Sequence, residues 1–213
     1  MLGDILLIND SHHKAASQIM DQIHDRQEEK LILAIGGESG SGKTEIAHVL
    51  ARSLKNRGTP AKTMHIDNYY LTPPADRTDW RKENGLESIG YTEYNWSLIN
   101  QHLQNFRDDH DHVVTPCIDL LTDQVDELHT SFKGFHYLIV EGLYAVKAEA
   151  DLSFLLDITY HKTKLAQLKR GKEPLNQYRW DVLEREHTVV QSLRPRADYF
   201  ISEEFEVYPA ARG

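Results

Sequence analysis

The chain contains one octet that few folds can accommodate, the sequence GESGSGKT at residues 37–44. It follows the pattern G-x-x-x-x-G-K-[ST], whose glycines let the backbone curl so that successive N–H groups point at a phosphate. The motif requires a strand before it and a helix after it. Residues 31–35 form a short apolar run typical of a buried strand, and apolar residues recur at helical spacing from Ile46 to Leu54. We therefore predict strand, phosphate-binding loop and helix.

The predicted loop is expected to bind a nucleoside triphosphate. Lys43 can reach the β- and γ-phosphates, and the Thr44 hydroxyl can coordinate Mg²⁺. Backbone N–H groups and the positive end of the following helix provide the other contacts. The residues expected to hold the nucleotide are Gly37, Ser39, Gly40, Ser41, Gly42, Lys43 and Thr44.

Composition narrows the class of protein. The 213 residues suffice for one filled core, and 40% hydrophobic with 27% charged residues is ordinary for a globular domain. No run is long enough for a membrane span and no export signal precedes the loop, so we expect no membrane partner. The single cysteine, Cys117, fits a reducing cytoplasm. The net charge of −9 argues against nucleic acid and favours a small-molecule partner.

Two acidic residues follow predicted strands. Residues 61–66 alternate loosely and end on Asp67, and the apolar run at residues 135–142 ends on Glu141. In a parallel α/β sheet the carboxyl ends of the strands meet at one edge, where ligands bind. Asp67 could be a catalytic base for an acceptor hydroxyl or could only close a turn. Glu141 could direct Mg²⁺ or could only cap its strand.

Residues 1–30 precede the loop strand and are expected to form an N-terminal helical extension of a domain at residues 31–213. Ser11 is the expected N-cap of a helix that ends near Glu29, with Ala15 and Ile19 on its apolar face. This helix would pack on the domain or join two copies of the chain, so a homo-oligomer is allowed.

Residues 67–96 lose all periodicity and hold several prolines, glycines and aromatic residues. A long loop inside a compact domain is usually functional, and we predict that this one faces the acceptor. Its aromatic rings could enclose a flat acceptor or simply pack the loop.

The remaining elements are short. A helix is expected at residues 96–107, then a solvated turn at residues 108–112 and an edge strand at residues 113–116. Two further strands are expected at residues 154–158 and, as the last of the chain, at residues 199–201.

Residues 161–196 are positively charged, although the chain as a whole is negative. They contain nine Lys and Arg and four Asp and Glu, which gives a local charge of +5. Basic groups beside a phosphate site can neutralise a transferring phosphoryl group, so this stretch is predicted to be a lid. Arg170, next to Gly171, is the candidate lid arginine; salt-bridged helix faces are the alternative for other cations.

Four stretches together resemble the P-loop uridine kinase/phosphoribulokinase family, and most closely its uridine kinase branch: GGESGSGKT at 36–44, IDNYY at 66–70, LIVEGLYA at 138–145 and RPRADYFI at 194–201. The resemblance implies a three-layer α/β kinase fold, with a mostly parallel sheet, that transfers the γ-phosphate of ATP to a hydroxyl. By this match Asp67 would be the catalytic carboxylate, Tyr70 would contact the acceptor and Glu141 would be the Walker B acid. Weaker matches place Asp119 and Gln177 near the acceptor.

The resemblance favours uridine or cytidine as the acceptor, but two positions depart from it. Uridine kinases usually contact the nucleoside with a Tyr and a His where this chain has Ile118 and Asp123. Their Asp-His-Pro stretch is also missing. A sugar phosphate or a pantothenate-like alcohol is therefore the alternative acceptor within the family, and a non-catalytic nucleotide-binding module is a third interpretation.

Overall fold

A six-stranded sheet forms the centre of the computed structural model, which describes residues 2–26, 28–163 and 176–211. The strand order is β2-β5-β1-β6-β7-β8; all neighbours pair in parallel except β7 and β8, which are antiparallel. The strand bounds are β1 Leu31–Gly37, β2 Ala61–His65, β5 Tyr137–Gly142, β6 Leu152–Leu156, β7 Tyr199–Ile201 and β8 Val207–Pro209.

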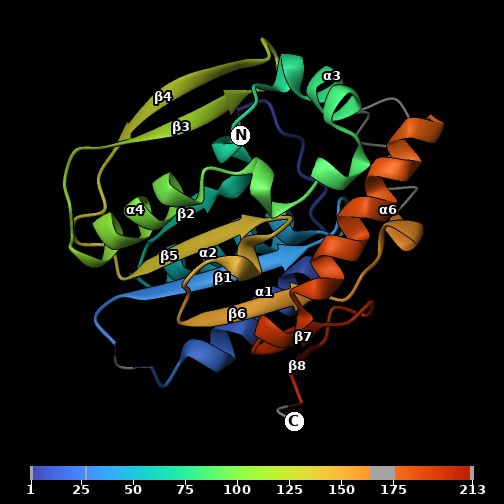
Figure 1. Ribbon diagram of the computed structural model, residues 1–213. Coiled ribbons are helices and arrows are strands. Elements are labelled where there is room, and N and C mark those ends of the chain that lie inside the picture. The colour runs from blue at the N-terminus through green and yellow to red at the C-terminus, as the bar shows by residue number, and fades with distance from the viewer. Residues whose placement is uncertain (1, 27, 164–175, 212–213) are drawn as a thin grey trace.

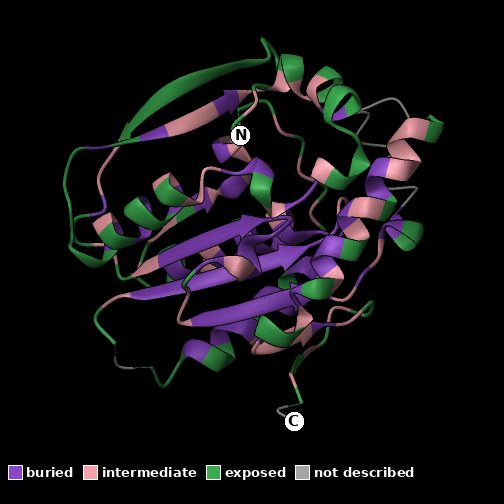
Figure 2. Ribbon diagram, viewed as in Figure 1, coloured by how far each residue is buried: buried purple, intermediate pink, exposed green. Residues whose placement is uncertain are grey.

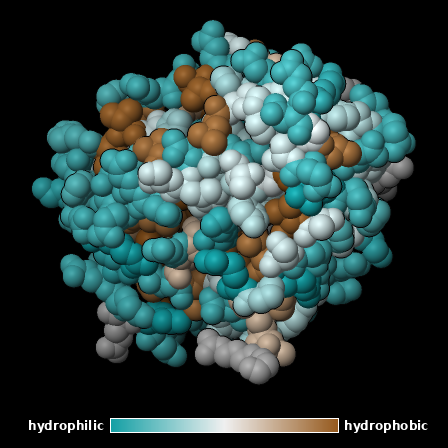
Figure 3. Space-filling model, viewed as in Figure 1, coloured by the Kyte–Doolittle hydropathy of each residue, from teal (hydrophilic) through white to brown (hydrophobic). Residues whose placement is uncertain are grey.

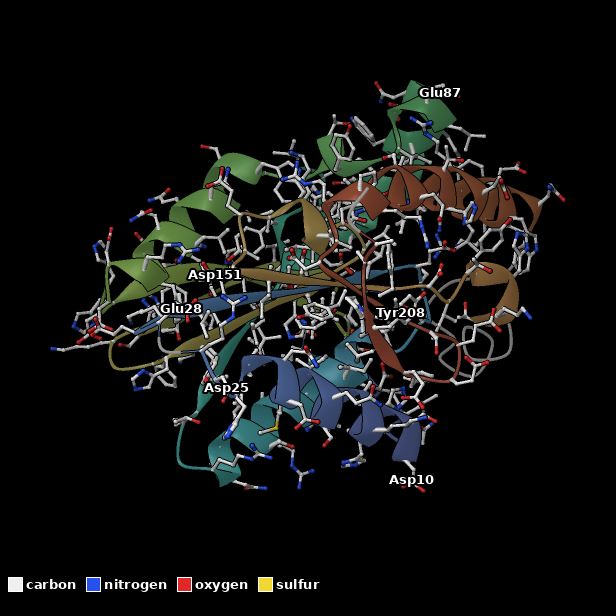
Figure 4. All side chains as sticks on the ribbon, turned by 90° about the horizontal axis from the view of Figure 1, so that it is seen from below. Asp10, Asp25, Glu28, Glu87, Asp151 and Tyr208 are labelled. Carbon is white, nitrogen blue, oxygen red and sulfur yellow. The ribbon has the colours of Figure 1, made fainter. Side chains whose placement is uncertain are left out.

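Helices cover both faces of this sheet, which confirms the three-layer α/β prediction (Figure 1). On one face lie α1 (Asp10–Ile23) and α2 (Lys43–Asn56), and on the other lie α4 (Trp96–Arg107) and α6 (Gln177–Ser192). The edge-on view in Figure 4 shows the layers directly. Every residue of β1 is buried, as expected for a parallel strand with both faces covered (Figure 2).

Two hydrophobic clusters fill the spaces between the layers. Ile19 of α1 and Leu50 of α2 pack with Phe154 of β6 on one face. Phe106 of α4 and Val190 of α6 belong to the cluster on the other face. The apolar positions that gave the helical periodicity at residues 46–54 and 96–107 are therefore those that face the sheet.

The helix in the N-terminal region differs at both ends from the prediction. Its N-cap is Asn9, whose side chain accepts hydrogen bonds from Ser11 N and His12 N, so Ser11 lies inside the helix. The helix ends at Ile23 and not near Glu29, because the apolar face stops there. Ala15 and Ile19 are buried as expected.

The segment at residues 67–96 contains a helix, where a long loop was predicted. This helix, α3 (Pro74–Asn84), begins with a proline in its first turn and ends at Gly85, the usual punctuation of helices. It has no apolar stripe because its only buried residue is Arg81, and periodicity therefore could not reveal it. A short 3₁₀ turn at Ile66–Tyr69 precedes α3, and two more follow it at Leu86–Ser88 and Tyr91–Glu93.

The strand predicted at residues 113–116 is present, but it is longer and belongs to a separate antiparallel hairpin. This hairpin consists of β3 (Val113–Asp119) and β4 (Gln124–Thr130), and β4 is almost entirely exposed. Hydrophobic patches gather on this part of the surface (Figure 3), where Val114, Leu121 and Leu128 are exposed. The turn at residues 108–112 is solvated as predicted.

The strand at residues 199–201 exists, but it is not the last. The chain returns through β8, which pairs with β7 and closes that edge of the sheet. Among the described residues, no helix is both long and apolar enough to cross a membrane.

Candidate active site

The loop at residues 37–44 joins β1 to α2, and its shape depends on glycine. Gly42 has φ +99° immediately before the helix, and a Cβ there would lie 2.8 Å from His12 Nε2 of α1. A Cβ on Gly37, with φ +155°, would lie 2.9 Å from both Leu156 Cβ and Ser41 Oγ. Larger residues would push the loop out of the concave shape that presents N–H groups to an anion.

The loop lysine lies inside the site. Lys43 is 8% exposed, and its Nζ donates to the carbonyl oxygen of Glu38 at 3.3 Å, across the loop. This contact holds the ammonium group over the concave side of the loop. A phosphate bound there would meet both the cation and the helix N-terminus.

Thr44 and Glu141 meet at the end of β5. The Thr44 hydroxyl donates to Glu141 Oε2 at 3.2 Å, and Glu141 Oε1 pairs with Nδ1 of His65, the last residue of β2. Burial raises the pKa of Glu141, but the contact with His65 and the charge of Lys43 outweigh it and lower that pKa. An ionised carboxylate beside a hydroxyl is a pair that Mg²⁺ uses together with phosphate oxygens.

Asp67 lies at the same edge of the sheet, in the 3₁₀ turn that follows β2. Its Oδ1 accepts a hydrogen bond from the Tyr94 hydroxyl at 3.1 Å, and the Tyr94 oxygen lies 2.6 Å from that of Tyr70. Burial raises the pKa of Asp67, whereas the charge of Lys43 lowers it. The carboxylate, the loop lysine and Glu141 thus influence one another electrostatically.

The backbone can bring these acids together because β5 ends in Gly142. A Cβ on this residue would lie 2.3 Å from Ile66 Cγ1 and 3.3 Å from Asp67 Oδ1. With φ +148°, the residue also has a conformation that side chains disfavour. The glycine after the strand-end acid is therefore part of the site's construction.

A charged layer lies behind Asp67. The Arg77 guanidinium lies 3.5 Å from the centre of the Tyr70 ring, and Arg81 forms a two-pronged ion pair with Glu93 at 2.7 and 3.0 Å. Arg81 also reaches Glu186 of α6 at 3.5 Å. Within the described residues, these contacts join α3, the 3₁₀ turn at Tyr91–Glu93 and α6.

Several polar atoms in this layer are buried without a hydrogen-bond partner among the described residues. They are Arg77 Nε, Tyr144 Oη, Tyr178 Oη and Glu186 Oε2. Unpartnered buried polar atoms cost stability, so such a group in one place indicates a site that a ligand or water completes.

The other predicted acceptor residues have different surroundings. Asp119 is half-buried in the hairpin and its Oδ1 accepts from Leu121 N at 2.8 Å. The hairpin approaches the site through Ile118, whose N–H donates to Asn68 Oδ1 at 3.0 Å. Gln177 is exposed at the start of α6 and donates to Asp181 at 2.9 Å. Arg170 lies outside the described residues.

The sequence did not single out His65, Arg77, Arg81, Glu93 or Glu186 as site residues. Arg77, Arg81 and Glu93 lie in the segment of charged and aromatic residues between positions 67 and 96, whereas His65 and Glu186 lie outside it. Residues of the site can be close in space but distant in the sequence, as Arg81 and Glu186 are, and no local pattern reveals such contacts.

Residues 32–172 match the model of the Phosphoribulokinase / Uridine kinase family. The chain belongs to this family. It is therefore a P-loop small-molecule kinase by descent. The members of this family differ in the acceptor that they phosphorylate.

Three known proteins show how diverse its relatives are. The chain is 24% identical over 195 residues to the bifunctional alpha-galactosidase/sucrose kinase AgaSK of Mediterraneibacter gnavus, which covers 85% of this chain but 21% of that protein. A structure from Bacillus stearothermophilus, described as a possible uridine kinase, has a TM-score of 0.63 at 18% identity, covering 87% of this chain and 96% of that one. D-glycerate 3-kinase from Cryptococcus neoformans has a TM-score of 0.58 at 12% identity, covering 94% and 98%.

Proposed function

We propose that this protein transfers the γ-phosphate of ATP to a hydroxyl group of a small, neutral, polyhydroxylated acceptor such as a sugar. The observation that carries the transfer step is the position of Asp67 and Lys43 beside the pair of Thr44 and Glu141 at one edge of the sheet. Membership of a P-loop kinase family supports ATP as the donor.

The donor side of the reaction would be held by the loop. Its N–H groups and Lys43 would bind the β- and γ-phosphates, and Thr44 and Glu141 would hold Mg²⁺, which supplies charge neutralisation on the phosphates. Lys43 acts where charge develops in the transition state, so Lys43→Ala should cost several kcal/mol of activation free energy, about 3 kcal/mol by analogy with other such contacts.

Asp67 would receive the proton of the attacking hydroxyl. It lies at the carboxyl end of β2, and its hydrogen bond from Tyr94 fixes one oxygen and leaves the other for the acceptor. The raised pKa that burial gives Asp67 makes it a stronger base than an exposed carboxylate. Tyr70, whose hydroxyl lies next to that of Tyr94, would then border the acceptor.

The charges behind Asp67 support a neutral acceptor. Among the described residues there, Arg77, Arg81 and Arg179 balance Asp67, Glu93 and Glu186. A phosphorylated or carboxylated acceptor would call for an excess of cations. The unpartnered atoms comprise donors and acceptors, which match hydroxyl groups because each hydroxyl can both donate and accept.

The relative from Mediterraneibacter gnavus also supports a sugar, since its name includes a sucrose kinase activity. A nucleoside is the second candidate, supported by the resemblance to uridine kinases and by the structural neighbour described as a possible uridine kinase. Against it, Ile118 is buried and bonded to Asn68, and Asp123 lies in the hairpin turn. Neither can provide the ring contacts that the resemblance would require.

The test is ADP release with Mg²⁺ and ATP across sucrose, fructose, glucose, D-glycerate, uridine and cytidine. Turnover with a sugar well above that with uridine supports the proposal, and the reverse order would establish the nucleoside instead. Tyr144→Phe should raise KM for the sugar about threefold or more while KM for ATP stays unchanged, because it removes one buried hydroxyl. Tyr137→Phe, at the opposite end of β5, is the matched control.

A further inference from the structure

A second concave site lies beside α2 and does not include Asp67. It is a cavity of about 380 Å³ between α2, the edge strand β2 and the N-terminal residues that run past them. Figure 4 shows the layer that α1 and α2 form on one side of the sheet. The cavity shares Thr44, the last residue of the phosphate-binding loop, with the nucleotide site, but it includes no residue of the acceptor cluster around Asp67. Its volume is in the range of small-molecule sites.

The walls of this cavity are apolar and its rim is basic. Leu6, Ala47, Ala51 and Ala61 form much of the lining. Three exposed side chains of α2 line the rim, and they lie on one face of the helix because they are three or four residues apart. They are His48, Arg52 and Lys55. Such a lining suits a molecule with an apolar body and an anionic group.

Two basic residues of the rim are placed to bind a ligand. Within the described part of the chain, neither Arg52 nor Lys55 forms an ion pair, although many other cations of the molecule do. Asp4 is the only acid among the described residues that line the cavity, so the rim has a positive balance.

The inner end of the cavity reaches the nucleotide site. Two of its lining residues, Thr44 and His65, are the same residues that contact the carboxylate of Glu141. An anion that draws the His65 imidazole toward itself would weaken the pairing with Glu141. Occupancy of the cavity and binding of Mg²⁺ and ATP would then oppose each other.

We propose that this cavity is a regulatory site for a small organic anion with an apolar body, and that its occupant weakens the binding of Mg²⁺ and ATP through His65 and Thr44. The coupling rests on the proposed nucleotide site, whereas binding to the cavity does not. Because coupling between two sites is reciprocal, Mg²⁺ and ATP must also weaken the anion's binding by the same factor.

The test titrates the intact protein with anilinonaphthalene sulfonate, an aromatic anion whose fluorescence reports binding, with and without Mg²⁺ and a non-hydrolysable ATP analogue. We expect one dye site whose Kd rises to a plateau, about fivefold, as the analogue saturates. Complete displacement of the dye by the analogue would place it in the nucleotide site and overturn the proposal. An unchanged Kd in the presence of bound analogue would overturn the coupling.

Two variants locate the dye. Arg52→Ala combined with Lys55→Ala should raise its Kd about five- to tenfold, since two partly screened contacts are lost. Ala51→Leu should block binding by filling the cavity while it retains the charges and the helix. The matched control combines Arg57→Ala with Lys133→Ala, which removes the same charge from outside the cavity. Equal dye affinity in all four proteins would overturn the proposal.

Separate controls distinguish failure of the two proposals. Binding of the analogue is measured directly by calorimetry in each protein, so a defective nucleotide site is recognised without any dye. If the analogue does not bind, the nucleotide site of the proposed function is wrong and so is the coupling, while the dye titrations of the variants still decide whether the cavity binds an anion.

Discussion

Glu38 of the phosphate-binding loop and His187 of α6 are joined by a hydrogen bond of 2.7 Å between Oε1 and Nδ1. Glu38 is 2% exposed, and its other oxygen accepts from Tyr160 N at 2.7 Å, while Gln191 also donates to Oε1. One buried carboxylate of the loop therefore holds the chain both before and after residues 164–175. The loop is thus bonded to Tyr160, just before the basic stretch predicted from the sequence, and to α6 within that stretch.

Glu38→Ala is expected to reduce the free energy of unfolding by about 3 kcal/mol, because it leaves several buried donors unpaired. Glu38→Gln retains one acceptor oxygen and should lose about half as much. Denaturant unfolding measures both. The control is Glu203→Ala, which removes a surface partner of Lys162 and should change stability by less than about 0.5 kcal/mol. A loss no larger than that of the control would show that the Glu38 contacts do not stabilise the fold.

Asp67→Asn should lower the rate of transfer about 10²- to 10⁴-fold, the usual contribution of a general base, with little effect on ATP binding. The same substitution should raise the melting temperature at neutral pH. Burial raises the pKa of Asp67 above its ordinary 3.8, so the folded protein holds this proton more tightly than the unfolded chain. Stability linked to Asp67 is thus lost as the pH rises from about 3.8 through the raised value.

The gain in melting temperature of Asp67→Asn should accordingly shrink as the pH falls toward 3.8, which a series of thermal melts would follow. The wild-type rate should fall over the same interval, since the protonated carboxyl cannot accept a proton. Asp79→Asn, on the exposed face of α3, is the control and should alter neither quantity. A rate unaffected by Asp67→Asn would remove Asp67 from the mechanism, and loss of ATP binding would point to a metal-holding role.

His12→Ala tests whether α1 supports the loop. The His12 ring is buried, accepts a hydrogen bond from Asn9 N at 3.0 Å and lies edge-on to Phe205, with its Nε2 close behind Gly42. Its loss should cost about 1–2 kcal/mol of stability and raise the KM for ATP, since it removes both a helix cap and the support of the loop. The neighbouring exposed His13, changed to Ala, should leave both unchanged. Identical behaviour of the two variants would mean that α1 does not support the loop.

The sequence predicted the parts of the fold whose cause is local. The loop motif, the apolar strand predicted at residues 135–142 and the helix predicted at residues 96–107 each contain their own signal. All three are present, although the strand begins only at Tyr137. The acids Asp67 and Glu141 could be placed at one edge because parallel topology puts strand ends there.

The remainder depends on contacts between distant residues. The buried side of helix α3 is polar, because Arg81 forms ion pairs there with Glu93 and Glu186. In most helices an apolar residue would occupy such a buried position. Strand β4 was not predicted because nearly all of its residues are exposed, so it lacks the pattern of buried apolar residues that indicates a strand. The cavity beside α2 also depends on residues that are distant in the sequence, since Arg52 and Ala61 come together only when β2 lies next to the helix.

Gly142→Ala adds one methyl group and should strongly disturb the site. The new Cβ would lie 2.3 Å from Ile66 Cγ1, within a buried strand end, so the turn that holds Asp67 must move. We expect a loss of about 2–4 kcal/mol in stability, from strain in the backbone plus overpacking. The rate should fall as well, because a shift of the base by about 1 Å can cost about 10²-fold.

Gly58→Ala separates these two contributions. Gly58 has φ +83° at the end of α2, but nothing lies within 4 Å of the position that its Cβ would take. This variant therefore measures the backbone cost alone, about 1 kcal/mol, and should keep full activity. Equal stability losses in the two variants, with activity retained in both, would show that Gly142 serves only its own backbone conformation. A larger loss in Gly142→Ala, together with slower transfer, would mean that this glycine positions Asp67.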